Sequence, residues 1–403
     1  MRILIIGSGG REHALAWRLS QSPLIEEIFA SPGNPGMAEL GTCIPGPADV
    51  SGYTDIASRF GADLTIVGPE APLVAGVVDH FRACGLKIVG PTQAAARLEG
   101  SKRFAKEFFL RAGIPTARLG KSVSDLSFPM VIKADGLAGG KGVIIAQDQR
   151  EADEALAKLG TDVIFEEFLQ GEEVSFIGVS NGRDLVPFTP TQDHKRLCDN
   201  DEGPNTGGMG AYADSRILTS AQSGEIMDRI MLPALAQMAK EGAPFTGFLY
   251  AGLMMTTNGP KVLEFNVRLG DPETQALMHS YQGDLVELLE PAANGAALPA
   301  PAKSVFSSAC VVLASAGYPD QPQTGDVIHG LEDAESKGAV VFHAGTKQIG
   351  ERLVTNGGRV LGVTAGGENL KEAIDAAYAA ARHIHFEGMQ YRSDIGQKGL
   401  RRS

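Results

Sequence analysis

The segment "EFNVRLGDPETQ", residues 264–275, places acids, amides and an arginine in what otherwise looks like a buried strand. Alternate side chains of a strand point to opposite faces of its sheet. Three apolar side chains are therefore predicted to share the face that packs in the core: Leu263, Phe265 and Val267. Three polar side chains are predicted to share the other face: Glu264, Asn266 and Arg268.

The polar face of this strand suits a metal ion and an anion. Glu264 and Asn266 are two residues apart, and carboxylate and amide oxygens are ligands of hard cations such as Mg²⁺. Arg268 is placed to hold a carboxylate or phosphate through paired hydrogen bonds. Residues 270–272 signal a turn, so Asp271 is predicted just past the strand. The alternative is an exposed edge strand with a surface ion pair; convergence of these groups on a turn favours the metal-and-anion site.

Bulk properties limit the possible functions. The chain has 403 residues, enough for several domains, and its net charge of −12 argues against nonspecific binding to nucleic acid or anionic membranes. Its four cysteines lie far apart, which predicts neither a zinc site nor a disulfide framework. No apolar run approaches membrane-spanning length. We expect a cytoplasmic protein with small-molecule partners.

Residues 1–100 alternate short apolar strands with helical stretches, one of them predicted over residues 72–85. This alternation predicts a small parallel sheet with helices on both faces. Glu70 follows a strand, so it is predicted at the sheet's carboxyl edge, where open α/β sheets bind ligands. A solvated loop glutamate is the commoner alternative.

The turn "GSGGREHA", residues 7–14, leads from the first strand into a helix, where free backbone N–H groups bind anions. A dinucleotide fingerprint would need glycine in place of Glu12, and no acid ends the second strand, so a nicotinamide role is disfavoured. Gly9 and Gly10 either contact a phosphate or ribose or serve a tight turn. These two interpretations stay open at this point.

A second glycine-rich segment, "VIKADGLAGGKGV" at residues 131–143, lies between two predicted strands. Gly142 follows Lys141 where a Walker loop has Ser or Thr, and a strand replaces the helix. The pattern favours a flap that lays backbone N–H groups over phosphates, with Lys133 and Lys141 supplying charge. A flexible surface hairpin is the alternative.

Further polar segments follow. Residues 166–169 lie between strands and are predicted to receive an adenine, with Glu173 near ribose hydroxyls. A long polar loop then carries His194, Lys195, Arg196 and Asn205, and loops of this length are usually functional or disordered.

The last hundred residues predict a small α+β domain. Lys347 and Arg359 lie in glycine-bearing loops suited to phosphate, although a lone surface cation is commoner.

Taken in order, these segments resemble the glycinamide ribonucleotide synthetase family of the ATP-grasp superfamily. The resemblance spans nearly the whole chain and rests on "GSGGREHALAW", "PGNPG", "VGPEAPLVAG", "VIKADGLAGGKGV", "EEFLQGEEVSF", "QDHKR", "GPNTGGMGAY", "EFNVRLGDPETQ" and "TNGGRVLGVTA". One departure is a short segment, "READEALAKLGTDV", where the family has a longer insertion.

The resemblance implies a mixed α/β and α+β multidomain fold. An N-terminal parallel α/β domain would occupy residues 1–100 and an ATP-grasp central domain residues 101–120 and 186–303. A small lid would occupy residues 121–185, and a C-terminal α+β domain residues 304–403. A monomer is expected.

The resemblance also implies an activity. Glycine would be activated by ATP with Mg²⁺ (or Mn²⁺), and 5-phosphoribosylamine would then attack glycyl phosphate to give glycinamide ribonucleotide. Another ATP-grasp carboxylate–amine ligase of purine biosynthesis, or a non-catalytic nucleotide-binding protein, is the alternative.

Residue roles carry over by the same resemblance. Glu264 and Asn266 would bind the metal, Arg268 would lie close to the acyl phosphate, and Asp271 would lie near the amine. The residues implied in nucleotide binding are Lys102, Lys133, Gly139, Gly140, Lys141, Gly142, Glu166, Glu167, Phe168, Leu169, Glu173, Lys195, Arg196 and Asn205. Those assigned to the ribosylamine are Gly9, Gly10, Glu70, Asp271, Lys347 and Arg359.

Overall fold

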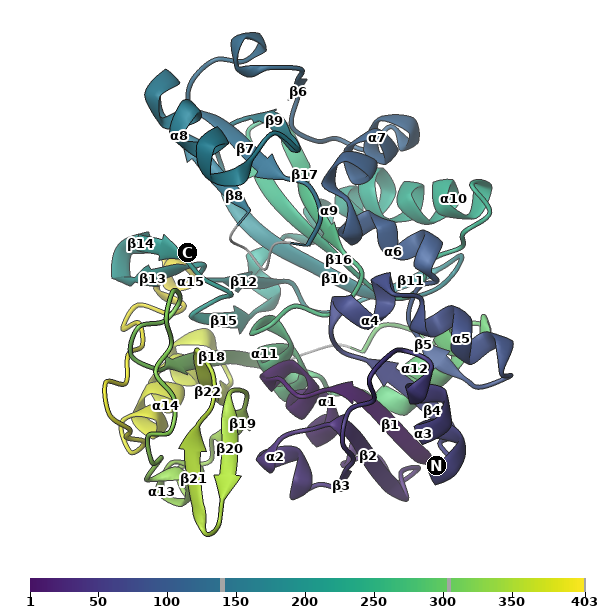
Figure 1. The fold of residues 1–403 in the computed structure, drawn as a ribbon, viewed down its shortest axis with the longest axis vertical. Coiled ribbons are helices and arrows are strands. Elements are labelled where there is room, and N and C mark those ends of the chain that lie inside the picture. Colours follow the sequence, from purple (N-terminus) through teal and green to yellow (C-terminus); the bar gives the residue numbers. More distant parts are fainter. Residues whose placement is uncertain (138–141, 303–305, 402–403) are drawn as a thin grey trace.

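The computed structural model describes residues 1–137, 142–302 and 306–401 (Figure 1). Gly139, Gly140 and Lys141, which were predicted for the phosphate flap, lie outside the described residues. The described residues form three larger sheets: a parallel sheet at the N-terminus, a small four-stranded sheet, and a long antiparallel sheet that extends into the C-terminal region.

The N-terminal sheet is parallel, as predicted, with strand order β3-β2-β1-β4-β5. Its strands are β1 (Arg2–Gly7), β2 (Glu27–Pro32), β3 (Thr42–Cys43), β4 (Leu64–Val67) and β5 (Ile88–Val89). Alternate residues of β1 enter different cores: Ile3 and Ile5 pack with α1 (Gly10–Leu19), whereas Leu4 and Ile6 pack in the cluster that contains α3 (Gly52–Phe60). Helices therefore cover both faces.

The prediction of a single helix over residues 72–85 is wrong. Two helices replace it, α4 (Glu70–Val74) and α5 (Val77–Ala83). Gly76 stands between them with a φ of 88°. This left-handed conformation cannot continue a right-handed helix, and glycine adopts it without a Cβ clash. Glu70 is the first residue of α4, directly after Pro69.

The long sheet has nine strands and the path β17-β16-β10-β12-β15-β18-β22-β19, with β11 paired to β10. The strands are β10 (Glu172–Asn181), β11 (Leu185–Pro187), β12 (Thr191–Asp193), β15 (Gly210–Ala213), β16 (Thr246–Thr256), β17 (Gly259–Asn266), β18 (Ser307–Ala314), β19 (Val340–His343) and β22 (Arg359–Gly367). The pairing of β15 with β18 carries the sheet into the last hundred residues.

The four-stranded sheet has the order β6-β9-β7-β8 and its own small core. Its strands are β6 (Leu119–Gly120), β7 (Met130–Ala134), β8 (Val143–Ala146) and β9 (Val163–Glu167), and α8 (Gln149–Leu159) packs on it. β10 falls within the segment predicted for the lid, yet it pairs in the nine-stranded sheet. The predicted domain boundaries themselves stay a prediction.

A bulge changes the predicted faces of β17. Glu264 pairs with Gly252 and Val262 with Leu253, so Leu263 is an extra residue in the ladder. A bulge of this kind turns a side chain away from its regular face. Val262 and Phe265 consequently share the core face.

Leu263 was predicted on that core face, and this was wrong. It packs instead beside Leu169 and Met254. Phe265 and Val267 are buried as predicted. The strand ends at Asn266, so Val267 and Arg268 lie just beyond it.

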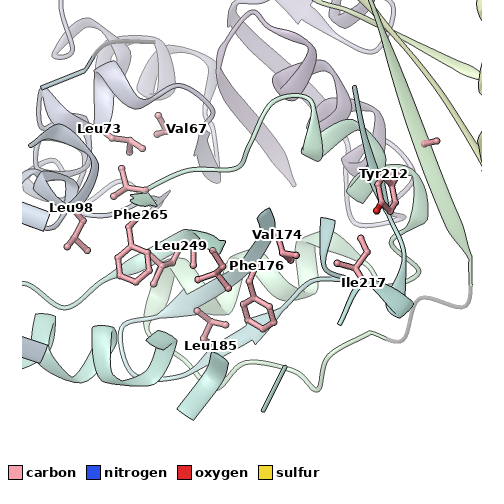
Figure 2. Packing of buried hydrophobic residues seen from close by; sticks show 14 of the residues in the cluster. Val67, Leu73, Leu98, Val174, Phe176, Leu185, Tyr212, Ile217, Leu249 and Phe265 are labelled. Atoms are coloured by element: carbon pink, nitrogen blue, oxygen red, sulfur yellow. The ribbon is translucent and has the colours of Figure 1, made fainter. Parts of the chain in front are cut away.

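The N-terminal unit and the nine-stranded sheet share one hydrophobic core. Figure 2 shows Val67, Leu73 and Leu98 beside Phe265 and Leu249. Among the helices that contribute to this core are α6 (Gln93–Gly100), α7 (Lys102–Ala112), α9 (Ser220–Ile226), α10 (Leu232–Lys240) and α14 (Leu370–Ala381). On the other side, α11 (Glu273–Ser280) and α12 (Leu285–Asn294) join α1 in a second core. In the described ranges no helix combines the length and apolar character needed to cross a membrane.

Candidate active site

A cavity of about 1020 Å³ opens between the N-terminal unit, the four-stranded sheet and the nine-stranded sheet. It brings together most of the residues predicted from the sequence. Those on its wall are Glu70, Lys102, Lys133, Gly142, Glu166, Glu167, Phe168, Leu169, Glu173, Lys195, Arg196, Asn205, Glu264, Asn266, Arg268, Asp271 and Arg359.

Glu264 and Asn266, at the end of β17, are the candidate metal ligands on this wall. Burial raises the pKa of Glu264, but the ammonium groups of Lys195 and Lys133 and other nearby cations outweigh it and lower the pKa. Glu264 is therefore an ionised carboxylate. The described residues hold no cluster of three or more metal-binding acids, histidines or cysteines. One carboxylate and one amide still fit Mg²⁺, which usually keeps waters and phosphate oxygens as its other ligands.

Arg268 is held between two carboxylates. Its Nη2 lies 2.9 Å from Glu99 Oε1 and its Nε lies 3.2 Å from Glu70 Oε2. Burial opposes the charge, but both carboxylates raise the pKa of Arg268. Glu99 also accepts a hydrogen bond from the Val267 backbone N–H at 2.8 Å. Sequence reasoning missed Glu99, although it lies in "LEGSK" at the end of α6.

Asp271 links distant parts of the chain. Its Oδ2 lies 3.3 Å from Arg359 Nη2, and Arg359 Nη1 donates to the carbonyls of Asp271 and Gly207 at 2.5 and 2.6 Å. Burial raises the pKa of Asp271, but Arg359 and other cations outweigh it and lower the pKa. A Cβ on Gly9 would lie 3.5 Å from Asp271 Oδ2, so the N-terminal turn closes on the same carboxylate.

The glycine turn packs tightly. The Gly9 N–H donates to Glu12 Oε2 at 2.6 Å, and Glu12 Oε1 accepts from Arg11 Nε at 2.5 Å. A Cβ on Gly10 would lie only 2.5 Å from Gln275 Nε2 on α11. A larger residue at this position would therefore displace the Gln275 amide, which donates to Asp271 Oδ1 at 2.9 Å.

Lys347 and Arg359 were both predicted to bind the ribosylamine, but their surroundings differ. Arg359 lines the cavity. Lys347 is exposed on β20 (Thr346–Ile349), which pairs with β21 (Arg352–Thr355), and it is not part of the cavity wall described here.

The end of β9 contains a buried charge cluster. Glu166 Oε2 lies 3.0 Å from Lys133 Nζ and 3.2 Å from Lys106 Nζ. Burial lowers the pKa of Lys106 to about 8, although Glu166 opposes the shift. Glu166 Oε1 is buried and accepts no hydrogen bond from the described residues. It is thus a buried acceptor on the wall of the cavity.

An apolar surface of the cavity lies next to this cluster. Leu169, Met254 and Leu263 line it and pack together with Ala117. The bulge in β17 supplies Leu263 to this surface. On the polar side, Lys195 Nζ lies 2.7 Å from Glu173 Oε2, and Lys102 Nζ donates to the Gly136 carbonyl at 2.7 Å. The arrangement fits a flat base with a polar sugar attached.

A buried acidic group on the cavity wall was not assigned from the sequence. Tyr250 donates to Glu273 Oε1 at 2.9 Å, and Ser175 Oγ lies 2.7 Å from the Tyr250 hydroxyl oxygen. Burial and the neighbouring carboxylates, opposed by Lys195, raise the pKa of Asp193 to about 7. Asp193 lies within "QDHKR" and Glu273 within "GDPETQ". The sequence therefore contains both motifs but does not show that the fold brings the two acids close together.

Comparison with known proteins identifies the class of this fold and site. Residues 100–274 match the model of the phosphoribosylglycinamide synthetase ATP-grasp (A) domain, so the chain is an ATP-grasp protein. Residues 1–99 match the N domain and residues 308–398 the C domain of the same synthetase. The chain belongs to the phosphoribosylglycinamide synthetase family.

Known relatives align with this chain over its full length. The phosphoribosylamine–glycine ligases of Vibrio cholerae and Escherichia coli K12 are each 48% identical to the chain, with 100% of this chain and 99% of each relative covered. The crystal structure of the Thermotoga maritima phosphoribosylamine–glycine ligase superposes with a TM-score of 0.85 at 34% identity, covering 98% of this chain and 100% of that one. The N5-carboxyaminoimidazole ribonucleotide synthetase of the same organism shares the fold, with a TM-score of 0.66 at 18% identity and coverage of 96% and 99%.

Proposed function

We propose that this protein is an ATP-dependent ligase that joins glycine to 5-phosphoribosylamine, giving glycinamide ribonucleotide, ADP and phosphate in purine biosynthesis. Full-length membership of the phosphoribosylglycinamide synthetase family supports this assignment. The observation that carries the chemistry is Arg268, held between Glu70 and Glu99 beside the pair formed by Glu264 and Asn266. A fixed cation beside a metal-binding pair suits phosphoryl transfer from ATP.

The nucleotide is proposed to lie between the four-stranded and nine-stranded sheets. The base would lie on the apolar surface that contains Leu263 and Met254, and the free Glu166 Oε1 would accept an N–H from it. Glu173 would contact the ribose, and Lys102 and Lys133 would approach the phosphates. Lys195, Arg196 and Asn205 would complete this wall. The proposed lid consists of residues 121–185, and its closure would exclude water from the reactive acyl phosphate.

Glu264 and Asn266 would hold Mg²⁺ (or Mn²⁺) on the ATP phosphates, where the bound ion would offset their negative charge. In the first step a glycine carboxylate oxygen attacks the γ-phosphorus and the bond to ADP breaks, which gives glycyl phosphate. Arg268 lies beside the metal pair, so it would stabilise the charge that develops on the transferring group.

In the second step the ribosylamine nitrogen attacks the acyl carbon, the bond from the acyl carbon to the phosphate oxygen breaks, and the proton lost by the amine leaves with the phosphate. Arg359 and the surroundings keep Asp271 ionised, so its carboxylate can accept a hydrogen bond from the attacking amine and orient it. Gly9 and Gly10 approach this point from the N-terminal turn. Glu70 and Arg359 would line the amine side of the cavity. Cytoplasmic location and a monomeric state stay predictions from the sequence.

The test is ADP formation with Mg²⁺, ATP, glycine and freshly prepared phosphoribosylamine, with each component omitted in turn. We expect ADP and glycinamide ribonucleotide in equal amounts, and neither product at a comparable rate when glycine or the amine is absent. Turnover with a different carboxylate or amine in place of these two would identify another ATP-grasp ligase. ATP binding without turnover would identify a non-catalytic nucleotide-binding protein.

A further inference from the structure

A hairpin at the cavity and the C-terminal end of the chain are bound to each other. The 196–205 hairpin consists of β13 (Arg196–Cys198), a short helical turn (Asp199–Asp201) and β14 (Glu202–Asn205). The C-terminal arm, residues 390–401, includes α15 (Gln397–Leu400). Figure 1 shows α15 beside β13 and β14, although almost two hundred residues separate them in the chain.

Arg392 is the centre of this contact. It is only 1% exposed, and its Nη1 donates to the Arg196 carbonyl at 3.1 Å and to Asp201 Oδ1 at 3.0 Å. Its Nε and Nη2 each donate to Asp394 at 2.7 Å, which fixes the guanidinium plane. A buried guanidinium needs such complete pairing, because desolvation of an unpaired charge is costly. These contacts therefore bind the C-terminal arm to the hairpin.

Backbone groups reinforce the contact in both directions. The Asn200 N–H donates to Asp394 Oδ2 at 2.9 Å, and the Ser393 N–H donates to Asp199 Oδ1 at 2.8 Å. Lys398 Nζ donates to Asp201 Oδ2. The arm thus holds all three residues of the turn at the tip of the hairpin.

The turn has a backbone conformation that needs such support. Asn200 and Asp201 have φ values of 59° and 56°, and among the described residues they are the two non-glycine residues with positive φ. Residues with side chains adopt this region rarely, and it persists where surrounding contacts fix it. The contacts from Arg392, Asp394 and Lys398 are the surroundings that fix it here.

The hairpin and the arm both reach the cavity. Arg196, Asp201 and Asn205 of the hairpin line it, and Lys398 of the arm lines it beside them. We propose that the C-terminal arm is a positioning element of the active site. It holds the 196–205 hairpin so that Arg196 and Asn205 face the nucleotide, and it contributes Lys398 to the same wall. This inference rests on the proposed function, because it takes the ligand of this wall to be ATP.

The experiment measures ATP binding directly, by calorimetry of the full-length protein with ATP and Mg²⁺ but without glycine or phosphoribosylamine. In Asp394→Asn the paired contact of Arg392 is weakened without removing any cavity residue. We expect its Kd for ATP to rise about tenfold, the size of one lost charge-assisted hydrogen bond, and amide exchange in the 196–205 hairpin to accelerate. Lys398→Ala should show a similar rise, and Lys398→Arg should restore most of the affinity.

The matched control is Asp214→Asn. Asp214 pairs with Arg216 over the same spacing of two residues and with the same two-point geometry, with Nε–Oδ1 and Nη2–Oδ2 distances of 3.0 and 2.7 Å. It does not belong to the cavity wall. We expect this control to lower Tm with unchanged ATP affinity. Equal ATP affinities in Asp394→Asn and the control would overturn the inference.

A second variant covers the case in which Asp394→Asn does not fold. Asp199→Ala removes a half-buried partner of Ser393, and we expect it to weaken ATP binding about threefold; unchanged binding would overturn the inference. If the wild-type protein binds ATP normally while all variants match it, the arm is not a positioning element and the proposed function stands. A wild-type protein that binds no ATP would remove both proposals.

Discussion

Glu264 is a single carboxylate surrounded by cations, and this setting determines its role. Lys195, Lys133 and Arg268 keep it ionised in the folded protein. An ionised carboxylate beside the Asn266 amide is a good ligand for a hard cation, whereas a neutral amide in its place is a weaker one.

The first prediction therefore concerns Glu264→Gln. We expect the protein to fold and kcat/KM to fall on the order of a hundredfold or more, with partial recovery at high Mg²⁺, because a metal ligand has lost its charge. Steady-state kinetics across a Mg²⁺ titration measure this effect. Glu368→Gln, an exposed acid outside the cavity, is the control and should behave as the wild type. A normal Mg²⁺ response in Glu264→Gln would contradict the metal assignment.

Arg268 depends on its two carboxylate partners for orientation. Glu99 contacts both its guanidinium and the backbone just before it, so Glu99 fixes where the cation points.

We predict that Glu99→Gln lowers kcat roughly tenfold while the KM for ATP stays within about twofold, because orientation matters most in the transition state. Initial rates with ATP varied at saturating glycine and amine measure both constants. Glu290→Gln removes the surface pair with Lys87 and should change neither constant. Equal kinetics for Glu99→Gln and the wild type would show that Glu70 alone suffices to hold Arg268.

At the scale of elements, glycines show how local backbone geometry shapes the fold. Gly76 separates α4 from α5 with a φ of 88°, whereas Gly224 lies inside α9 with open space where a Cβ would lie. The same substitution should therefore have opposite effects at the two positions.

We predict that Gly76→Ala destabilises the protein by about 1–2 kcal/mol, since a Cβ is unfavourable in the left-handed region. Gly224→Ala should stabilise it by roughly 0.5–1 kcal/mol, because alanine reduces the entropy of the unfolded chain and favours helix. Denaturant midpoints of the two variants check both signs. If Gly224→Ala destabilised the protein as much as Gly76→Ala, the backbone conformation of these glycines would not determine the change in stability.

Elements with strong local patterns could be predicted from the sequence, and those set by long-range register could not. Alternation of strands and helices predicted the N-terminal parallel sheet correctly. The bulge at Leu263 was not predictable, because it depends on how β17 pairs with Gly252 and Leu253 of β16. The break at Gly76 was also missed, since an apolar helical period continues across it.

The site shows the same division. Glu264, Asn266 and Arg268 were predicted because they alternate in one short segment. Glu99 and Lys398 were missed because each is an ordinary charged residue in its own helix. Only the fold places them beside Arg268 and Asp201 respectively. Lys347 is the opposite case: its glycine-bearing loop suits phosphate, yet Lys347 is not among the residues that line the cavity.

At the scale of the whole molecule, two buried histidines join the N-terminal unit to the C-terminal region. His13 Nδ1 accepts the His343 backbone N–H at 2.8 Å, and the two ring centroids are 5.6 Å apart. Burial, with a smaller contribution from His343, lowers the pKa of His13 from 6.5 to about 3, and burial lowers that of His343 to about 4. Both rings are neutral in the folded protein at pH 7.

A histidine whose pKa is lowered by folding makes the free energy of unfolding depend on pH. Between about pH 6.5 and the folded values the unfolded chain binds more protons, so the free energy of unfolding falls as the pH falls through this window. Acidification from pH 7 to pH 5 should cost about 2 kcal/mol through His13 alone.

We predict that His13→Asn, which keeps an acceptor near the Nδ1 position, makes the decrease in Tm between pH 7 and pH 5 smaller than in the wild type. Thermal unfolding at several pH values measures this slope. His383→Asn replaces an exposed histidine and should leave the slope unchanged. An identical slope in His13→Asn and the wild type would mean that this interface does not contribute to acid sensitivity.

The nine-stranded sheet has a practical consequence for dividing the molecule. β15 and β18 pair from Gly210 with Val311 to Ala213 with Ser308, so the backbone ladder continues across the predicted boundary near residue 303. A fragment cut at that boundary would expose the unpaired N–H and C=O groups of β15, and the complementary fragment would expose those of β18. Open strand edges pair readily with other chains. Each piece produced alone should therefore aggregate, and mixing the two during refolding should restore solubility.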